Sequence, residues 1–309
     1  MRLWLHFSLL ILCCSANAMS TPELPPFDKL WDYGKPAETE ARFRALLPKA
    51  REAGDPSYLC QLLTQIARTH SLRNSFDESH RLLDEAERLL RPELKLARVR
   101  YALERGRAFN PAGKREKARP LFLQAWEVAR EAGEDYFAVD AAHMLGIVEP
   151  PAQALEWHLK ALALAEASGE ERAKGWLGPL YNNLGWTYFE QKEYARSLDL
   201  LRKALAWYEA KKLPEQVRIA KWSVAKLLRV HGKVEEALRT QEALHREREQ
   251  LGKPDGYVFE ELGECLLALD RSQEARPHFA RAYELLSKDE WLVRAEPKRI
   301  ERLKTLGGQ

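Results

Sequence analysis

The chain has 309 residues, of which 45% are hydrophobic and 31% are charged, and its formal net charge is +3. This composition excludes a disordered chain and a protein made mainly of membrane spans, and the balanced charge argues against a broad basic face for nucleic acid. Leu and Ala together far outnumber Val, Ile and Thr, so a substantial β-sheet is not expected. The composition predicts an all-α protein.

The first eighteen residues have the arrangement of a secretory signal peptide. Arg2 provides a short positive start, residues 3–14 form an apolar stretch, and small residues at positions 16 and 18 suit cleavage after Ala18. The apolar stretch is too short for a stable membrane span, which needs about 20 apolar residues. We therefore predict export to the periplasm or the medium, with residues 19–26 as a linker. The alternative is a cytoplasmic protein whose translation starts at Met19.

From residue 27 onward the chain reads as a succession of amphipathic helical segments. Three segments end on glycines that follow alanine-rich runs, Gly54, Gly133 and Gly169, where a helix C-cap favours a left-handed residue. In the best-defined unit, Leu184 and Gly185 share one helical face, and a turn at residues 191–193 follows. Charged residues 298–304 are predicted to form a solvated capping helix, with a frayed tail as the alternative.

A small residue opens the second helix of each successive unit. The spacing gives a repeat of about 39 residues, somewhat longer than the minimal 34 of the best-known helix-pair array. We predict a single array of about six to seven pairs over residues 27–288 and a capping segment over 289–309. The small residues are Thr39, Ser79, Ala118, Ala154, Ser197, Ala237 and Ala275.

The segment 179–208 resembles the tetratricopeptide repeat (TPR), whose pattern is aromatic-x2-Leu-Gly-x2-Tyr followed by Ala-x3-aromatic-x2-Ala. Segment 256–287 is similar, with Phe259, Leu262, Gly263 and Phe279 at the matching positions. The resemblance implies a right-handed superhelical solenoid of stacked antiparallel helix pairs, and a groove that holds a peptide or helix of a partner protein.

No residue pattern points to chemistry. The histidines show no metal-ligand spacing, and the chain has none of the common phosphate-binding or nucleophile motifs. We interpret Asp140 with His143, and Glu156 with His158, as helix-surface pairs. Paired carboxylates such as Glu260 and Glu261 are likewise expected to be exposed. We therefore predict no cofactor, no metal and no enzymatic activity, with an unrecognised catalytic site in the groove as the alternative.

The resemblance also implies which residues line the groove, since fixed positions of each first helix face inward in TPR proteins. Arginines mark the early units, an aromatic and amide strip the middle, and carboxylates the last unit; Asp140 and His143 lie between them. Exposed Trp and Arg side chains have the composition of an interface hot spot; the alternative is that both tryptophans pack inside the superhelix. The predicted groove residues are Arg68, Arg107, Asn182, Asn183, Trp186, Phe189, Trp222, Lys226, Arg229, Glu260, Glu261 and Glu264.

We thus predict an exported, non-catalytic scaffold that binds a protein or peptide partner and no nucleic acid. The alternative is a cytosolic assembly or regulatory module that starts at Met19. After cleavage only Cys60 and Cys265 would remain, too far apart in the array for a disulfide, whose Cα atoms must lie within about 7 Å. Two unpaired thiols fit a cytosolic protein slightly better and are the main sequence evidence against export.

Overall fold

The computed structural model describes residues 24–110 and 113–308, and all regular structure in these ranges is helical. The predicted signal peptide, residues 1–18, and most of the predicted linker lie outside the described residues. Internal contacts divide the chain into two compact units, residues 1–97 and 98–309, which we call unit 1 and unit 2 and describe separately. The extent of the predicted single array stays a prediction.

Unit 1 begins with a short 3-10 helix, η1 (Phe27–Leu30), in place of the first helix of a pair. Phe27 packs edge-on against Phe43, with ring centroids 6.2 Å apart. The side chain of Asp55 accepts hydrogen bonds from two backbone amides and so caps the following helix. The helices of this unit are α1 (Pro36–Glu52), α2 (Pro56–Ser71), α3 (Phe76–Leu89) and the first residues of α4 (Lys95–Phe109).

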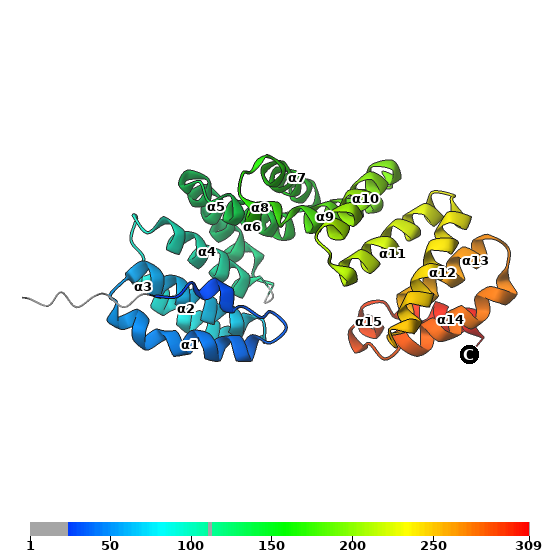
Figure 1. The fold of residues 1–309 in the computed structure, drawn as a ribbon, viewed down its shortest axis with the longest axis horizontal. Helices are drawn as coiled ribbons and strands as arrows, with labels where there is room; N and C mark the ends of the chain where they lie inside the picture. Colours follow the sequence, from blue (N-terminus) through cyan, green and yellow to red (C-terminus); the bar gives the residue numbers. More distant parts are fainter. Residues whose placement is uncertain (1–23, 111–112, 309) are drawn as a thin grey trace, which may run out of the picture. The chain divides into compact units, whose positions relative to one another are not determined.

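Unit 2 is a succession of helix pairs joined by short turns (Figure 1). Consecutive helices pack together, which is the arrangement that the repeat pattern predicts. After α4 the helices are α5 (Arg115–Ala132), α6 (Asp135–Val148), α7 (Pro151–Ala167), α8 (Glu171–Lys174), α9 (Leu177–Glu190), α10 (Tyr194–Ala210), α11 (Pro214–Val230), α12 (Val234–Gln250), α13 (Gly256–Ala268), α14 (Ser272–Leu286), α15 (Glu290–Ala295) and α16 (Pro297–Gly307).

The small residues predicted to open each second helix all lie at the fourth position of their helix. Six of these seven side chains are buried and that of Ala154 is half-buried. In α9 and α10 the reason is visible, because a Cβ at Gly185 would lie 2.7 Å from Leu201 Cδ2 and the hydroxyl of Ser197 donates to the Gly185 carbonyl over 2.7 Å. Small residues therefore let the two helices of a pair approach closely.

The predicted glycine caps are correct at two of three positions. Gly54 and Gly133 adopt left-handed φ angles of +67° and +71°. The prediction is wrong at Gly169: α7 ends at Ala167, and the extended Ser168 ends the helix. Its hydroxyl donates to Asp135 over 2.7 Å and accepts from the amide of Glu170 over 3.0 Å. The chain is thus directed into the short α8 instead of folding straight back.

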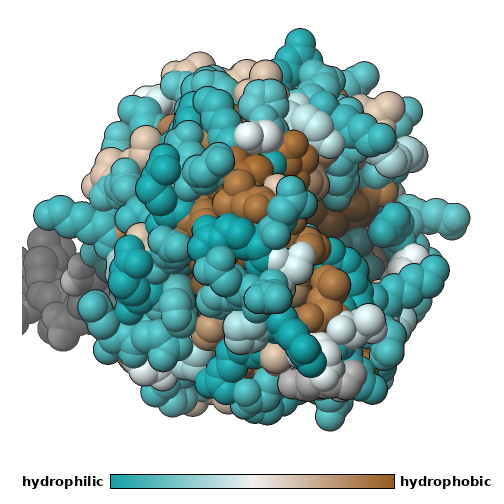
Figure 2. All heavy atoms as spheres, turned by 90° about the vertical axis from the view of Figure 1, so that its right-hand side faces the viewer, coloured by the Kyte–Doolittle hydropathy of each residue, from teal (hydrophilic) through white to brown (hydrophobic). Residues whose placement is uncertain are grey.

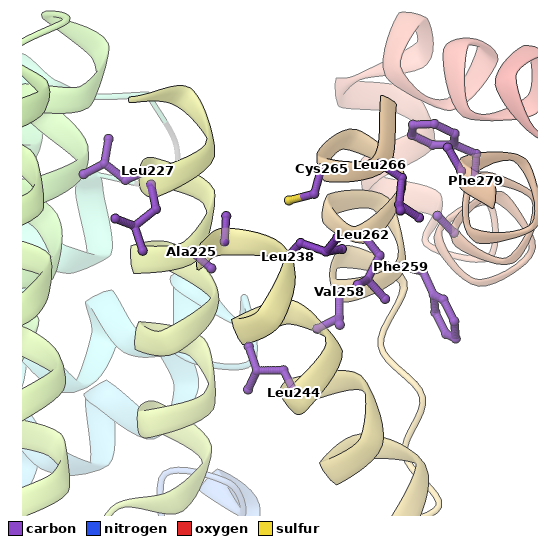
Figure 3. Close-up of a cluster of buried hydrophobic side chains, with 14 of the residues drawn as sticks. Ala225, Leu227, Leu238, Leu244, Val258, Phe259, Leu262, Cys265, Leu266 and Phe279 are labelled. Atoms are coloured by element: carbon purple, nitrogen blue, oxygen red, sulfur yellow. The ribbon is translucent and has the colours of Figure 1, made fainter. Parts of the chain in front are cut away.

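The core of the C-terminal pairs is one continuous apolar cluster contributed by α10 to α16 (Figure 3). Cys265 lies in it as a free thiol, and Cys60 is a buried free thiol in unit 1. Burial raises the pKa of each thiol to about 12. α16 adds Ile300 and Leu303 to the buried set, so this helix is not wholly solvated. In the described ranges no helix is long and apolar enough to cross a membrane.

Candidate partner-binding surface

Four aromatic side chains follow one another across the first helices of successive pairs in unit 2. Trp186 and Phe189 lie on α9, Trp222 on α11 and Tyr257 on α13. The ring centroids are 5.3 Å apart between Trp186 and Phe189, 6.0 Å between Trp186 and Trp222, and 6.1 Å between Trp222 and Tyr257. We call these four residues the aromatic row. Their edge-on and tilted contacts are the arrangements that aromatic quadrupoles favour.

Both tryptophans of the aromatic row are half-buried, whereas we expected exposed side chains from the sequence. Both pack against the apolar cluster of the C-terminal pairs. The indole of Trp222 donates a hydrogen bond of 3.0 Å to the carbonyl of Tyr257. Trp222 of the neighbouring α11 covers part of the Trp186 ring. The two residues therefore hold adjacent pairs together as well as present a surface.

A hollow of about 360 Å³ opens beside the aromatic row. Its floor is mainly apolar, and Ile219 at its rim is 55% exposed. Figure 2 looks onto the C-terminal end of the chain and shows apolar surface gathered near the middle of that face, with hydrophilic side chains around it. The hollow is lined by Arg218, Ile219, Trp222, Leu244, Arg248, Asp255, Tyr257 and Val258.

Asn182 and Asn183 carry amide groups with hydrogen-bonding capacity to spare. Both are half-buried on α9. Their one hydrogen bond between side chains within the described residues is from Asn182 Nδ2 to Asn183 Oδ1, at 3.4 Å. An Asn amide offers two donors and a carbonyl acceptor. The Asn183 amide nitrogen is therefore available to a ligand next to Trp186.

The carboxylates predicted to form an acidic zone on α13 are neutralised by the protein itself. Glu260 and Glu261 are 7% and 1% exposed, so the expectation that they face solvent is wrong. Arg299 of α16 donates to Glu260 over 2.9 Å, and Arg302 donates to Glu264 over 3.3 Å. The physical reason is that α16 packs against α14 and its long arginine side chains reach α13, which sequence spacing does not reveal.

Glu261 also binds the two cations predicted to line the middle of the groove. Lys226 Nζ lies 3.3 Å from this carboxylate and 5.0 Å from the centre of the Trp222 ring. Arg229 donates twice to Glu261, over 2.8 and 3.1 Å. Burial disfavours the charge of Arg229, but the hydrogen bonds with Glu261 raise its pKa. Lys226 and Arg229 are thus anchored by Glu261, and the three groups together carry a net positive charge.

The two early arginines differ in their surroundings. Arg68 is half-buried on α2 of unit 1. Arg107 on α4 donates to Glu104 over 2.7 Å and also to Asp140 of α6. Burial works against the charge of Arg107, but Asp140 and Glu104 raise its pKa. Asp140 is 5% exposed, so its interpretation as part of a surface pair with His143 is wrong.

Sequence reasoning missed Arg299, Arg302 and every residue that lines the hollow except Trp222. Tyr257 ends the aromatic row, and Arg299 and Arg302 neutralise α13. One signal was present in the sequence. Arg299 and Arg302 are three residues apart and so share one helical face, and Glu260 and Glu264 are four residues apart and share a face of α13. Whether any predicted groove residue binds a partner stays a prediction. Within the described residues, no group of three or more His, Cys, Asp or Glu is placed to hold a metal ion.

A family model described as tetratricopeptide repeat matches residues 180–211, which contain most of α9, the turn after it and α10. The chain contains a tetratricopeptide repeat. Its all-helical solenoid of packed consecutive pairs is the fold of this family, which serves as a scaffold for protein interactions. No curated protein sequence matches the chain significantly.

Solved structures similar to this TPR protein share its fold at low sequence identity. A Signal Transduction ATPase with Numerous Domains with a tetratricopeptide repeat sensor, from Pyrococcus horikoshii, is 14% identical with a TM-score of 0.68. That match covers 89% of this chain and 44% of the Pyrococcus chain, so this chain spans less than half of that protein. BtubC from P. vanneervenii is 15% identical, with 74% and 93% coverage and a TM-score of 0.56. A putative kinesin light chain of Podosopora anserina is 18% identical, with 64% and 97% coverage and a TM-score of 0.50.

Proposed function

We propose that this TPR protein is a non-catalytic scaffold whose unit 2 binds a peptide or helix of a partner protein along the aromatic row. The observation that carries the proposal is the aromatic row itself, with the apolar hollow beside Trp222 and the available amide of Asn183 next to Trp186. Half-buried aromatic rings beside a hollow supply apolar anchoring area, and an amide group can fix the register of a peptide backbone.

Affinity purification with two tryptophan variants tests this proposal. Wild-type protein is used as bait, the recovered partners are identified by mass spectrometry, and recovery is then compared between Trp186→Ala and Trp291→Ala. Trp291 is 65% exposed and lies outside the aromatic row, so it controls for the loss of a tryptophan. Loss of a hot-spot aromatic typically weakens binding by about 2 kcal/mol, roughly thirtyfold.

The expected result is that Trp186→Ala loses the partner while Trp291→Ala retains it. The melting temperature of each variant is measured beside its binding, because Trp186 also contacts the core. A Trp186→Ala protein that melts early but still recovers the partner would show that the row is structural and that the binding site lies elsewhere.

The second part of the proposal is export. It rests on the charged start at Arg2, the apolar residues 3–14 and the small residue at Ala18. A reporter active only outside the cytosol, fused after residues 1–30, is expected to give a signal, whereas the same fusion made from residues 19–30 is expected to be silent. A silent reporter in both fusions would favour the alternative, a cytosolic assembly module that starts at Met19.

A further inference from the structure

The crossing of α6 and α7 differs from the other helix crossings of unit 2 in the side chain that fills it. In four of the five helix pairs of unit 2, a glycine of the first helix lies under a side chain of the second, so close that an added Cβ would clash with it; α11 has no glycine at its crossing with α12. In three pairs that side chain is apolar, whereas at α6 and α7 it is the imidazole of His158. The glycines and their partners are Gly106 with Phe122, Gly146 with His158, Gly185 with Leu201, and Gly263 with Phe279.

A second histidine from α6 stands beside the first. The ring centroids of His143 and His158 are 5.6 Å apart, and the ring of Trp176 lies 5.2 Å from that of His143. Four buried polar atoms at this one place make no hydrogen bond within the described residues: Nδ1 of His143, both ring nitrogens of His158, and Nε1 of Trp176. Neutral rings tolerate this setting far better than charged ones, because burying an unpaired charge is much costlier than burying a neutral polar group.

The charged groups around the two rings come from neighbouring helices and largely cancel. Arg107 and Glu104 of α4 and Asp140 of α6 form an ion-paired group beside His143, and Arg172 of α8 lies over the ring of Tyr136 at 4.1 Å. Burial lowers the pKa of His143 to about 4 and outweighs the opposing effect of Asp140. Burial also lowers the pKa of His158. Both rings are therefore neutral in the folded protein at pH 7.

We propose that His143 and His158 make the α6–α7 crossing an acid-sensitive joint, which loosens when either ring takes up a proton. The opening separates α6 from α7, and because each pair of a repeat array is stabilised by its neighbours, it weakens the array on both sides. The other three glycine crossings hold no ionisable group in contact with their glycine.

The direction of the effect follows from linkage. A histidine whose pKa is lower in the folded state binds more protons when it is released, so stability rises with pH between the two values. For His143 this window runs from about pH 4 in the folded chain to the ordinary 6.5. Stability is complete above pH 6.5 and is lost as the pH falls toward 4. At pH 5 the opening equilibrium should shift by roughly thirtyfold from His143 alone.

The experiment compares full-length wild-type protein with the double variant His143→Leu/His158→Phe. The second change restores the ring type seen at Phe122 and Phe279. Melting temperature and amide hydrogen exchange are measured at pH 7 and pH 5, with exchange corrected for its intrinsic pH dependence. We expect wild-type α6 and α7 to gain exchange at pH 5 and the melting temperature to fall by roughly 4–8 °C more in the wild type than in the double variant.

A matched control and a direct titration complete the test. His231 is exposed in the turn between α11 and α12, so His231→Gln should keep the wild-type pH response. The NMR titration of the two rings in wild-type protein does not depend on any variant folding, and a midpoint for His143 well below 6 supports the proposal. An equal loss of stability in the wild type and the double variant, or a midpoint near 6.5 for both histidines, would overturn it.

Discussion

The α13–α14 pair and the α6–α7 pair each place a glycine of the first helix under a ring of the second, but the rings differ in their chemistry. Phe279 covers Gly263 in the first pair, and His158 covers Gly146 in the second. Each region also buries an ion-paired group, but in α13 one carboxylate, Glu261, binds two cations, whereas near α6 one cation, Arg107, binds two carboxylates. The difference teaches that shape at the crossing sets the architecture, while the ionisable groups placed there set how each pair responds to mutation and pH.

The largest loss of folding stability is expected at Glu261, because two cations depend on this one carboxylate. Glu261→Ala leaves Lys226 and Arg229 without their carboxylate in a poorly hydrated place, and breaking a buried pair in this way costs about 3–5 kcal/mol. Asp140→Ala should cost less, because Arg107 keeps Glu104. Equilibrium urea unfolding measures both variants. Equal losses of stability in the two variants would show that a second carboxylate partner makes no difference.

The next effect tests the close approach of paired helices. Gly185→Leu forces a branched side chain into the space of Leu201, where even a Cβ would lie 2.7 Å from Cδ2. Overpacking of this kind costs up to about 3 kcal/mol, and the damage should spread to the neighbouring pairs. Gly169→Leu is the matched control, because nothing lies within 4 Å of its Cβ position and its φ is not left-handed. If both variants melt like the wild type, the assigned crossing is wrong.

A smaller loss of stability is expected when a histidine is placed at the α13–α14 crossing, as in α6–α7. Phe279→His places a polar ring in a site that is 1% exposed, at a cost of about 2 kcal/mol at pH 7. Its stability should then fall further than that of the wild type between pH 6.5 and 5, because the new ring is neutral when folded and protonated when released. Thermal unfolding across this pH range checks the prediction. A constant difference from the wild type would contradict it.

The smallest effect is expected at Lys226. Its charge lies over Trp222 and beside Glu261, so Lys226→Met should weaken partner binding by less than about tenfold and reduce its dependence on salt. Affinity measured by fluorescence anisotropy at low and high salt tests this. An unchanged salt dependence would show that Lys226 does not steer the encounter with the partner.

The sequence predicted the helix pairs correctly, but it did not predict which charged side chains are buried. Thr39, Ser197 and Ala275 all lie at the fourth position of their helices, because the spacing of small residues reflects local contacts within one pair. The burial of Glu260 was missed because Arg299 lies 39 residues further along the chain and reaches it through α16. Local periodicity reports the contacts within one helix pair. Ion pairs between distant residues depend on which helices pack against one another in the folded chain.

The aromatic row was predicted only in part, because its contacts join different helix pairs. The sequence placed Trp186 and Trp222 on first helices, but the contact between the two rings belongs to the packing between pairs. The sequence therefore identified which residues share the first helices of unit 2. It overestimated their exposure because the neighbouring pair covers one side of each ring.

The most direct test of the proposed function is hydrogen exchange of the full chain with and without a purified partner peptide. We expect protection on binding to concentrate in α9, α11 and the start of α13, where the aromatic row and the hollow lie. Protection confined to second helices such as α10 and α12, or to unit 1, would contradict the claim that the aromatic row forms the binding surface.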